Sequence, residues 1–155
     1  MFPGKTTGLA VEVEVVAEMS VFNPFDFFLD PAAEHLPVVY DPNLAARNSA
    51  LSCETAGFPR FSSLVDRVKN GLMSGKGDPD GKPRTIDFLV ALNQLLAAEI
   101  KYVIRLEPGV QSPEETLTLG SGSCRDTAWL LCQLLRHLGF AARFASGYRS
   151  SSNPT

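Results

Sequence analysis

Cys124 is the residue of this 155-residue sequence whose position best suits chemistry. It follows the loop Gly120-Ser121-Gly122-Ser123 and begins a segment with apolar residues at helical spacing. Ser121 or Ser123 suits the N-cap position of such a helix. A thiol in the first helical turn lies close to unsatisfied N–H groups, whose partial positive charge favours the nucleophilic thiolate. The pattern indicates a cysteine nucleophile at a helix N-terminus.

The same loop has the groups that a carbonyl substrate would need. N–H groups at a helix start stabilise the oxyanion that forms when a thiolate attacks a carbonyl. Glycines let a substrate approach the backbone closely, so Gly122 and Ser123 are candidates for substrate or oxyanion binding. Trp129 is a third candidate, with packing in the core as the alternative interpretation. On these residues alone, Cys124 can also be read as a small buried hydrophobic side chain, the commoner role of a lone cysteine.

The other two cysteines suggest neither a disulfide nor a metal site. Cys132 follows Cys124 by eight positions, about 12 Å along a helix, whereas the Cα atoms of a disulfide lie within about 7 Å. We expect Cys132 to be buried, and Cys53 has no partner in the sequence. No Cys-x-x-Cys or paired-histidine spacing occurs, and no cofactor is indicated. Three cysteines at irregular spacing are typical of reduced thiols, so we predict a cytoplasmic protein.

The segment around Cys124 resembles the nucleophile motif of the transglutaminase-like superfamily; it reads Gly122-Ser123-Cys124-Arg125-Asp126-Thr127-Ala128-Trp129. Residues 102–117 and 136–148 resemble the segments before and after that cysteine in bacterial members. Residues 21–28 resemble the end of the β-rich domain that precedes the core in these proteins. On this resemblance, residues 1–40 are the end of that N-terminal domain, 41–148 the N-terminal part of the core and 149–155 a polar tail.

The resemblance implies a papain-like fold and a cysteine enzyme that acts on peptide or protein amides as a protease, amidase or transamidase. In that family a histidine serves as base and then as acid, and an aspartate orients it. This sequence has only two histidines. His137 lies thirteen residues beyond Cys124, about 20 Å along one helix, whereas a base must come within about 3 Å. His35 falls in the part that resembles the N-terminal domain.

We therefore expect the sequence to be an internal fragment of a longer enzyme, inactive by itself because the histidine and aspartate are missing. The alternative is a transglutaminase-like scaffold or protein-binding module that catalyses no reaction. An intact Cys124 favours the enzyme, since a scaffold needs no thiol at a helix start.

The periodicity predicts an α+β fold, and the resemblance implies a small antiparallel sheet that is incomplete in this sequence. Helices are predicted over 61–73, 86–100 and 124–138, and strands near 10–16, 102–106 and 140–148. Ser112 begins a capping-box pattern with proline at the first helical position, which indicates one or two helical turns. An unpaired sheet edge would promote self-association.

Composition excludes several classes of partner. The net charge is −3 and basic residues occur only as isolated pairs, which argues against nucleic acid and against an anionic membrane surface. No stretch of about eighteen apolar residues occurs, and the first residues form no apolar signal segment.

Overall fold

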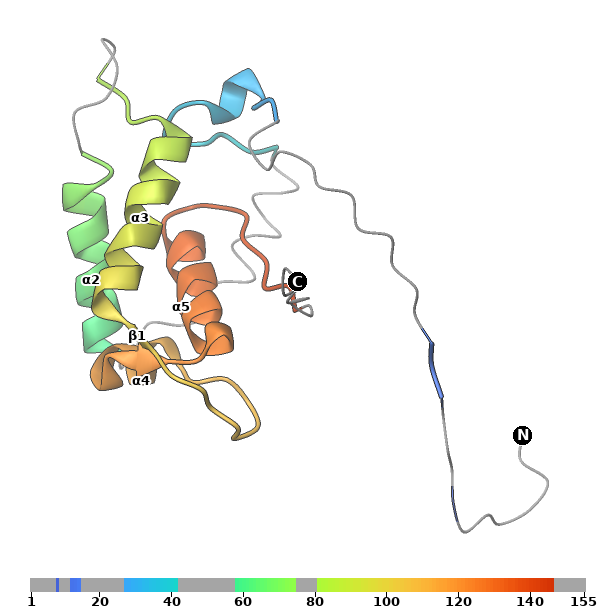
Figure 1. Ribbon diagram of the computed structural model, residues 1–155. Coiled ribbons are helices and arrows are strands. Elements are labelled where there is room, and N and C mark those ends of the chain that lie inside the picture. The colour runs from blue at the N-terminus through green and yellow to red at the C-terminus, as the bar shows by residue number, and fades with distance from the viewer. Residues whose placement is uncertain (1–7, 9–11, 15–26, 42–57, 75–80, 147–155) are drawn as a thin grey trace, which may run out of the picture.

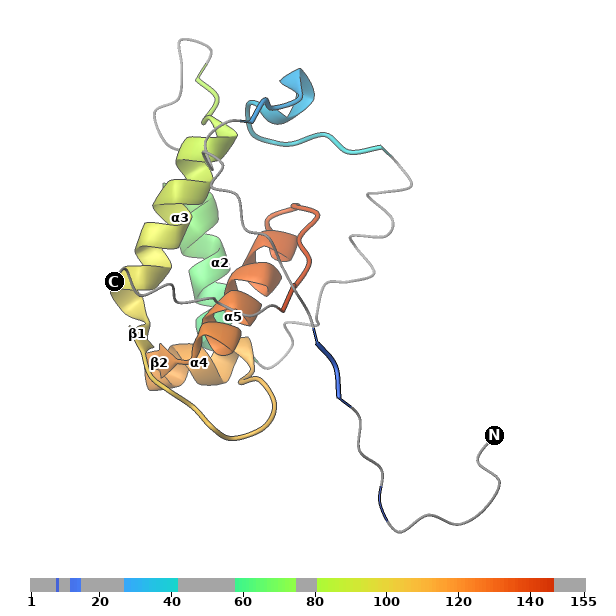
Figure 2. The same ribbon diagram turned by 45° about the vertical axis from the view of Figure 1, so that its right-hand side comes forward.

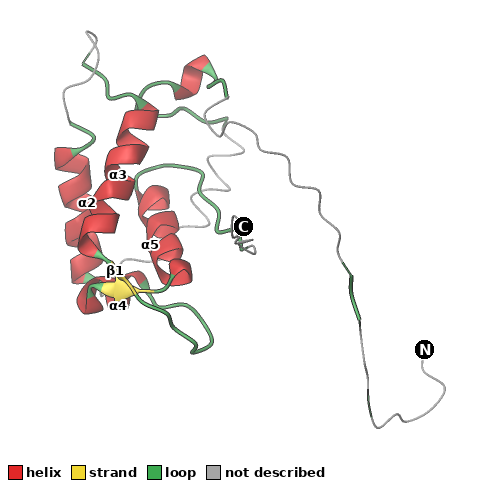
Figure 3. Cartoon of the chain, in the orientation of Figure 1, coloured by secondary structure: helices red, strands yellow, loops and turns green. Residues whose placement is uncertain are grey.

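The computed structural model describes residues 8, 12–14, 27–41, 58–74 and 81–146 (Figure 1). The elements follow in the order η1 (Pro31–Ala33), α2 (Pro59–Gly71), α3 (Thr85–Glu99), β1 (Lys101–Tyr102), α4 (Pro113–Leu119), β2 (Ser121–Gly122) and α5 (Cys124–His137). Figure 3 shows that helices make up most of this part of the chain, with one small strand pair. The predicted α+β class is confirmed.

The three predicted helices are α2, α3 and α5, and each begins and ends within two residues of its prediction. The predicted helical turns after Ser112 are α4, where the Ser112 side chain accepts the N–H of Glu115 and the Glu115 carboxylate accepts the N–H of Ser112. Gly120 ends α4 in the left-handed conformation, with a φ of 58°. Glycine favours that conformation because it has no Cβ.

The core lies between α2, α3 and α5 and continues into the residues that follow α5. Its buried members are Leu36, Phe61, Leu64, Val65, Val68, Phe88, Leu92, Leu96, Ile100, Leu130, Leu134, Leu138 and Phe140. Phe88 of α3 stacks on Phe140, with ring centroids 5.6 Å apart. The apolar stripes of the three helices therefore face one another, as the helical spacing predicted.

Hydrogen bonds and an ion pair join α2 to its neighbours. The Glu114 carboxylate of α4 accepts the N–H groups of Arg60 and Phe61, at 3.1 and 2.9 Å, in the first turn of α2. A carboxylate at this position stabilises a helix start, and here it replaces a local cap, because the N-cap residue Phe58 makes no side-chain bond. Two turns further along α2, Arg67 pairs with Glu99 at the end of α3, at 2.7 Å.

The two strands pair in parallel, Lys101 with Ser121 and Tyr102 with Gly122. Figure 2 shows β1 and β2 side by side where α3 ends. The prediction of an antiparallel sheet is wrong for this pair, because the chain passes through a loop and α4 before it reaches β2. Such a crossover returns the second strand in the same direction as the first.

The predicted strands are shorter than expected or absent. Of the strand predicted near 102–106, only Tyr102 lies in a strand, at the end of β1. Further along, the Arg105 side chain bonds to Asp126 of α5. The strand predicted over 140–148 is wrong for residues 140–146, which form no ladder: the Phe140 N–H bonds to the Leu135 carbonyl, and the Ala141 N–H to the hydroxyl of Tyr40. Residues 147–148 lie outside the described residues.

Of the strand predicted near 10–16, only residues 12–14 are described; they lie outside any strand, and Val13 is 76% exposed where half-burial was expected. The division at residue 40 stays a prediction. Within the described residues, Leu36 belongs to the core, and the carbonyl of Glu34 accepts the N–H of Thr85 at 2.8 Å. The tail 149–155 lies outside the described residues.

Candidate active site

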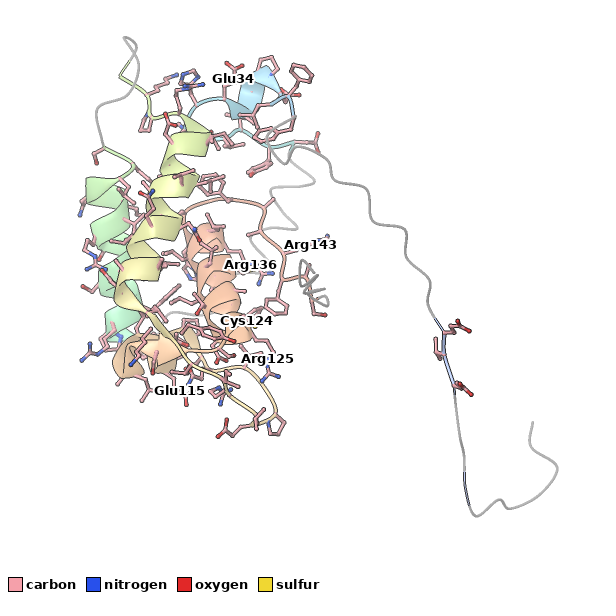
Figure 4. The ribbon with its side chains drawn as sticks, viewed as in Figure 1. Glu34, Glu115, Cys124, Arg125, Arg136 and Arg143 are labelled. Atoms are coloured by element: carbon pink, nitrogen blue, oxygen red, sulfur yellow. The ribbon has the colours of Figure 1, made fainter. Side chains whose placement is uncertain are left out.

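Cys124 is the first residue of α5 and its side chain is exposed. Figure 4 shows it at the end of α5 that adjoins the strand pair. Ser123 is the N-cap residue, with extended backbone angles. The backbone N–H groups of Cys124 and Arg125 are the first two of the helix, so they have no intrahelical acceptor. A thiol and two free donors thus meet at one helix start, as the sequence predicted.

The buried Asp126 carboxylate accepts the hydrogen bonds that hold this helix start in place. It forms a capping box with Ser123, whose N–H and hydroxyl both donate to Asp126 Oδ2, at 2.8 and 2.7 Å. The other oxygen, Oδ1, accepts the backbone N–H of Gln111 at 2.8 Å. The guanidinium of Arg105 donates to both oxygens, from Nε at 2.9 Å and from Nη2 at 3.4 Å. One carboxylate therefore joins the helix start to two points of the preceding loop.

The Asp126 carboxyl is fully buried, yet it is held in its charged form. Burial by itself would raise its pKa. The hydrogen bonds from Gln111, Ser123 and Arg105 outweigh this effect and hold the pKa well below its usual range. At neutral pH the site therefore contains a buried anion whose two oxygens both accept hydrogen bonds.

Arg125 ties the same loop to α5 from the other side of Cys124. Its Nη2 donates to the carbonyls of Arg105 and Glu107, at 3.4 and 3.2 Å. Both residues that flank Cys124 are therefore fixed, Ser123 through Asp126 and Arg125 through the loop. The position of the Cys124 backbone is consequently defined, although its own side chain is exposed.

Gly122 is buried directly against this network. A Cβ at that position would lie 2.9 Å from the Asp126 Cβ and 3.2 Å from Gln111 Oε1, both closer than atoms normally pack. Internal packing therefore requires glycine here, whatever a substrate requires. Ser123 is buried as well, so its hydroxyl faces Asp126 and not the solvent.

Trp129 is partly buried on a different side of α5 from Cys124. Its ring meets the Phe144 ring edge-on, with centroids 6.1 Å apart, and the guanidinium of Arg136 lies 5.6 Å from its centroid. Five residues along a helix correspond to a rotation of about 140°, so the two side chains leave the helix on different faces. The described contacts of Trp129 are therefore with Arg136 of the same helix and with Phe144 in the segment that follows α5.

Neither histidine lies near Cys124. His137 is the last residue of α5, about 20 Å from Cys124 by the helical rise; its Nδ1 lies 2.8 Å from the Gln133 carbonyl. His35 forms an isolated bridge with Arg84, immediately before α3. Figure 4 shows its neighbour Glu34 at the opposite end of the helices from Cys124. The exclusion of both histidines as the base agrees with this geometry.

Cys132 is buried, as predicted, and burial raises the pKa of its thiol, which the charge of Arg136 only partly offsets. Cys53 lies outside the described residues. Among the described residues, no group of three or more His, Cys, Asp or Glu side chains could hold a metal ion. In the same part of the chain, no helix is both long and apolar enough to cross a membrane.

Asp126 and Arg105 are the site residues that sequence reasoning missed. For Asp126 no role was predicted beyond its place in the nucleophile motif. The Ser123-x-x-Asp126 spacing is a capping-box pattern and could have revealed the bond to Ser123. Arg105 is the single charge in the run from Tyr102 to Leu106, a signal that a charge inside an apolar segment seeks a partner.

Comparison with protein families gives one match. The family model described as the transglutaminase-like superfamily matches residues 68–154, more than half of the chain. The matched part runs from the end of α2 through α5 and includes Cys124, Arg105 and Asp126. Comparison with curated proteins and with solved structures gives no match. The resemblance noted for residues 21–28 lies outside the matched part and stays a prediction.

Proposed function

Because the chain belongs to the transglutaminase-like superfamily, which includes cysteine enzymes, we propose that Cys124 is the nucleophile of a protease, amidase or transamidase. The observation that carries the proposal is the placement of Cys124: an exposed thiol on the first residue of α5, between two residues fixed by hydrogen bonds. The proposed substrates are amides of peptides or proteins.

In the proposed chemistry, the start of α5 carries the nucleophile and also supplies the N–H donors for the oxyanion. The Cys124 thiolate attacks the carbonyl carbon, a carbon–sulfur bond forms, and the carbonyl electrons move onto oxygen. The free N–H groups of Cys124 and Arg125 are placed to stabilise that oxyanion. Collapse of the intermediate breaks the carbon–nitrogen bond and leaves an acyl group on sulfur, and water or an amine then takes up the acyl group.

Neither histidine of this chain is placed to act as the general acid for the departing amine. Both histidines are accounted for, His137 at the far end of α5 and His35 before α3. An amine leaves as a neutral molecule only after it receives a proton, and without an acid this step becomes slow. We propose that the chain by itself is inactive on amides, while its cysteine remains competent to attack an activated acyl group.

A row of exposed apolar side chains beside the site supports an extended peptide as substrate. Tyr102, Ile104 and Leu106 are 64%, 79% and 91% exposed, whereas Val103 and Arg105 between them are partly buried. This alternation is that of an extended segment with one face in solvent. The segment adjoins the start of α5 through the bond between Arg125 and the Arg105 carbonyl. Extended peptides bind to such segments with alternating side chains in contact.

The proposal is tested with two acyl donors that differ in their leaving group. p-Nitrophenyl acetate releases a phenolate that needs no proton, whereas a peptide p-nitroanilide releases an amine that does. We expect a burst of about one equivalent of nitrophenolate from the ester and no release from the anilide. All variants carry Cys53→Ser so that this thiol does not contribute, and Cys124→Ala is compared with the matched control Cys132→Ala.

Each outcome decides one part of the proposal. A burst that persists in the Cys124→Ala variant excludes Cys124 as the nucleophile. Anilide cleavage that disappears in that variant shows that the chain is active on amides and contains its own acid. If wild type and Cys124→Ala behave alike with both donors, the alternative scaffold function is favoured; the distance of both histidines from Cys124 is the observation that supports it.

A further inference from the structure

A buried negative charge lies two residues from the proposed nucleophile. The Asp126 carboxylate is fully buried and charged, and it is bonded to Ser123, the residue directly before Cys124. A thiolate is a second negative charge, and a nearby like charge disfavours it, more strongly when the first charge is shielded from solvent. The carboxylate that builds the helix start would by itself oppose the reactive form of the cysteine.

Arg105 compensates for this charge. Its Nε lies 2.9 Å from Asp126 Oδ2 and its Nη2 3.4 Å from Oδ1, so the guanidinium faces both carboxylate oxygens. The Arg105 side chain is 20% exposed, so the pair is shielded from solvent on most sides. Arg105 Nη2 also donates to the Gly109 carbonyl at 3.3 Å, which fixes the guanidinium within the loop. Glu107 is a more distant partner, at 3.8 Å and largely exposed.

We propose that Arg105 is a positioning residue for Cys124: by pairing with Asp126 it lets a buried carboxylate hold the start of α5 without repelling the thiolate. The inference rests on the proposed nucleophilic role of Cys124 and deepens it. Asp126 fixes the position of the helix start, because it accepts hydrogen bonds from Ser123 and Gln111. Arg105 supplies the positive charge that offsets the Asp126 carboxylate, so that the Cys124 thiolate is not repelled.

Charge balance predicts that only one of the two single substitutions lowers the reactivity of Cys124. Arg105→Gln leaves the carboxylate uncompensated, so the thiolate is disfavoured. Asp126→Asn removes the anion and leaves the cation, so the thiolate is not disfavoured. The double variant restores neutrality. A purely structural role would instead give the same sign for both single variants, since each removes bonds from one network.

The test measures the alkylation rate of Cys124 by iodoacetamide at pH 7.5, by mass spectrometry of tryptic peptides from the full chain. Trypsin cleaves after Arg125, which places Cys124 and Cys132 on separate peptides. Cys132 is an internal control, because it reacts only if the variant has lost its fold. Arg67→Gln is the matched control, since it removes another arginine that pairs with a carboxylate, on α2.

We expect alkylation of Cys124 to fall about tenfold in Arg105→Gln, not to fall in Asp126→Asn, and to return to within about threefold of wild type in the double variant. Arg67→Gln should react as wild type does. The inference is overturned if Arg105→Gln reacts at the wild-type rate, or if both single variants slow by similar factors while Cys132 stays protected.

The two proposals fail in distinguishable ways. If Cys124 of the wild-type chain reacts no faster than N-acetylcysteine, the nucleophilic role itself lacks support. If Cys124 reacts faster than N-acetylcysteine but the rate does not fall in Arg105→Gln alone of the two single variants, only the role of Arg105 is wrong. If Arg105→Gln exposes Cys132 to alkylation and has therefore lost its fold, Arg105→Lys is measured in its place. Lysine keeps the positive charge, so Cys124 should keep most of its alkylation rate.

Discussion

The two ends of α5 are held in different ways. At the C-terminal end, apolar contacts predominate: Leu134 and Leu138 lie in the core, and Phe140 stacks on Phe88, although Arg136 also donates a hydrogen bond to the Ala142 carbonyl. At the N-terminal end, a single carboxylate with polar partners from three places in the chain holds the helix, and the thiol is exposed.

The difference indicates what each end does. Apolar packing stabilises the fold without defining the position of any one atom closely, whereas a fully satisfied buried polar network fixes geometry. The thiol of Cys124 lies at the end where geometry is fixed. This division predicts that substitutions at the two ends affect different observables.

The largest effect on stability is expected from the apolar end. Leu134→Ala removes a fully buried side chain and should lower the free energy of unfolding by about 2–5 kcal/mol, measured by urea denaturation. The matched control Leu119→Ala, at an exposed leucine of α4, should stay within about 0.5 kcal/mol. In folded Leu134→Ala the alkylation rate of Cys124 should be unchanged. A large loss of that rate would contradict the division.

A smaller loss of stability is expected from Gly122→Ala, which acts on the polar end. The new Cβ would lie 2.9 Å from the Asp126 Cβ, so the network must shift, at a cost of about 1–3 kcal/mol in the free energy of unfolding. Gly71→Ala in α2 is the control: it meets nothing within 4 Å and should stabilise the helix by up to about 1 kcal/mol. Equal effects of the two substitutions would show that Gly122 is not packed as described.

The smallest effect is confined to acid. Hydrogen bonds hold the pKa of Asp126 below its unfolded value, so its contribution is complete above about pH 4 and is lost as the pH falls toward the folded pKa. Between pH 4 and pH 3 the wild-type chain should lose about 1 kcal/mol more stability than Asp126→Asn. Parallel stability curves for the two proteins over that interval would show that Asp126 is not held in its charged form.

The helices could be predicted from the sequence because helical periodicity is local. The strands could not, because pairing joins distant residues. The segment after α5 has the alternation of a strand, yet its aromatic residues pack on helices: Phe140 stacks on Phe88, and Phe144 meets Trp129 edge-on. The direction of the β1–β2 pair follows from the crossover through α4, which periodicity does not reveal.

The candidate site divides in the same way. Cys124 and its N-cap Ser123 could be placed because both belong to one continuous junction. The network around Asp126 could not be predicted, because the partners of Asp126 lie 21 residues away at Arg105 and 15 residues away at Gln111. Spacing in the sequence shows which residues share a helical turn, but not which loop folds back on it.

The most direct test of the nucleophilic role of Cys124 is to locate the acyl group after one turnover. The chain is incubated with p-nitrophenyl acetate, quenched in acid and digested with trypsin, and the peptides are examined by mass spectrometry. The account predicts one acetyl group on the peptide that ends at Arg125, carried by Cys124, and none on the peptide that contains Cys132. Acetylation spread over lysines and all cysteines, or an unmodified Cys124, would contradict it.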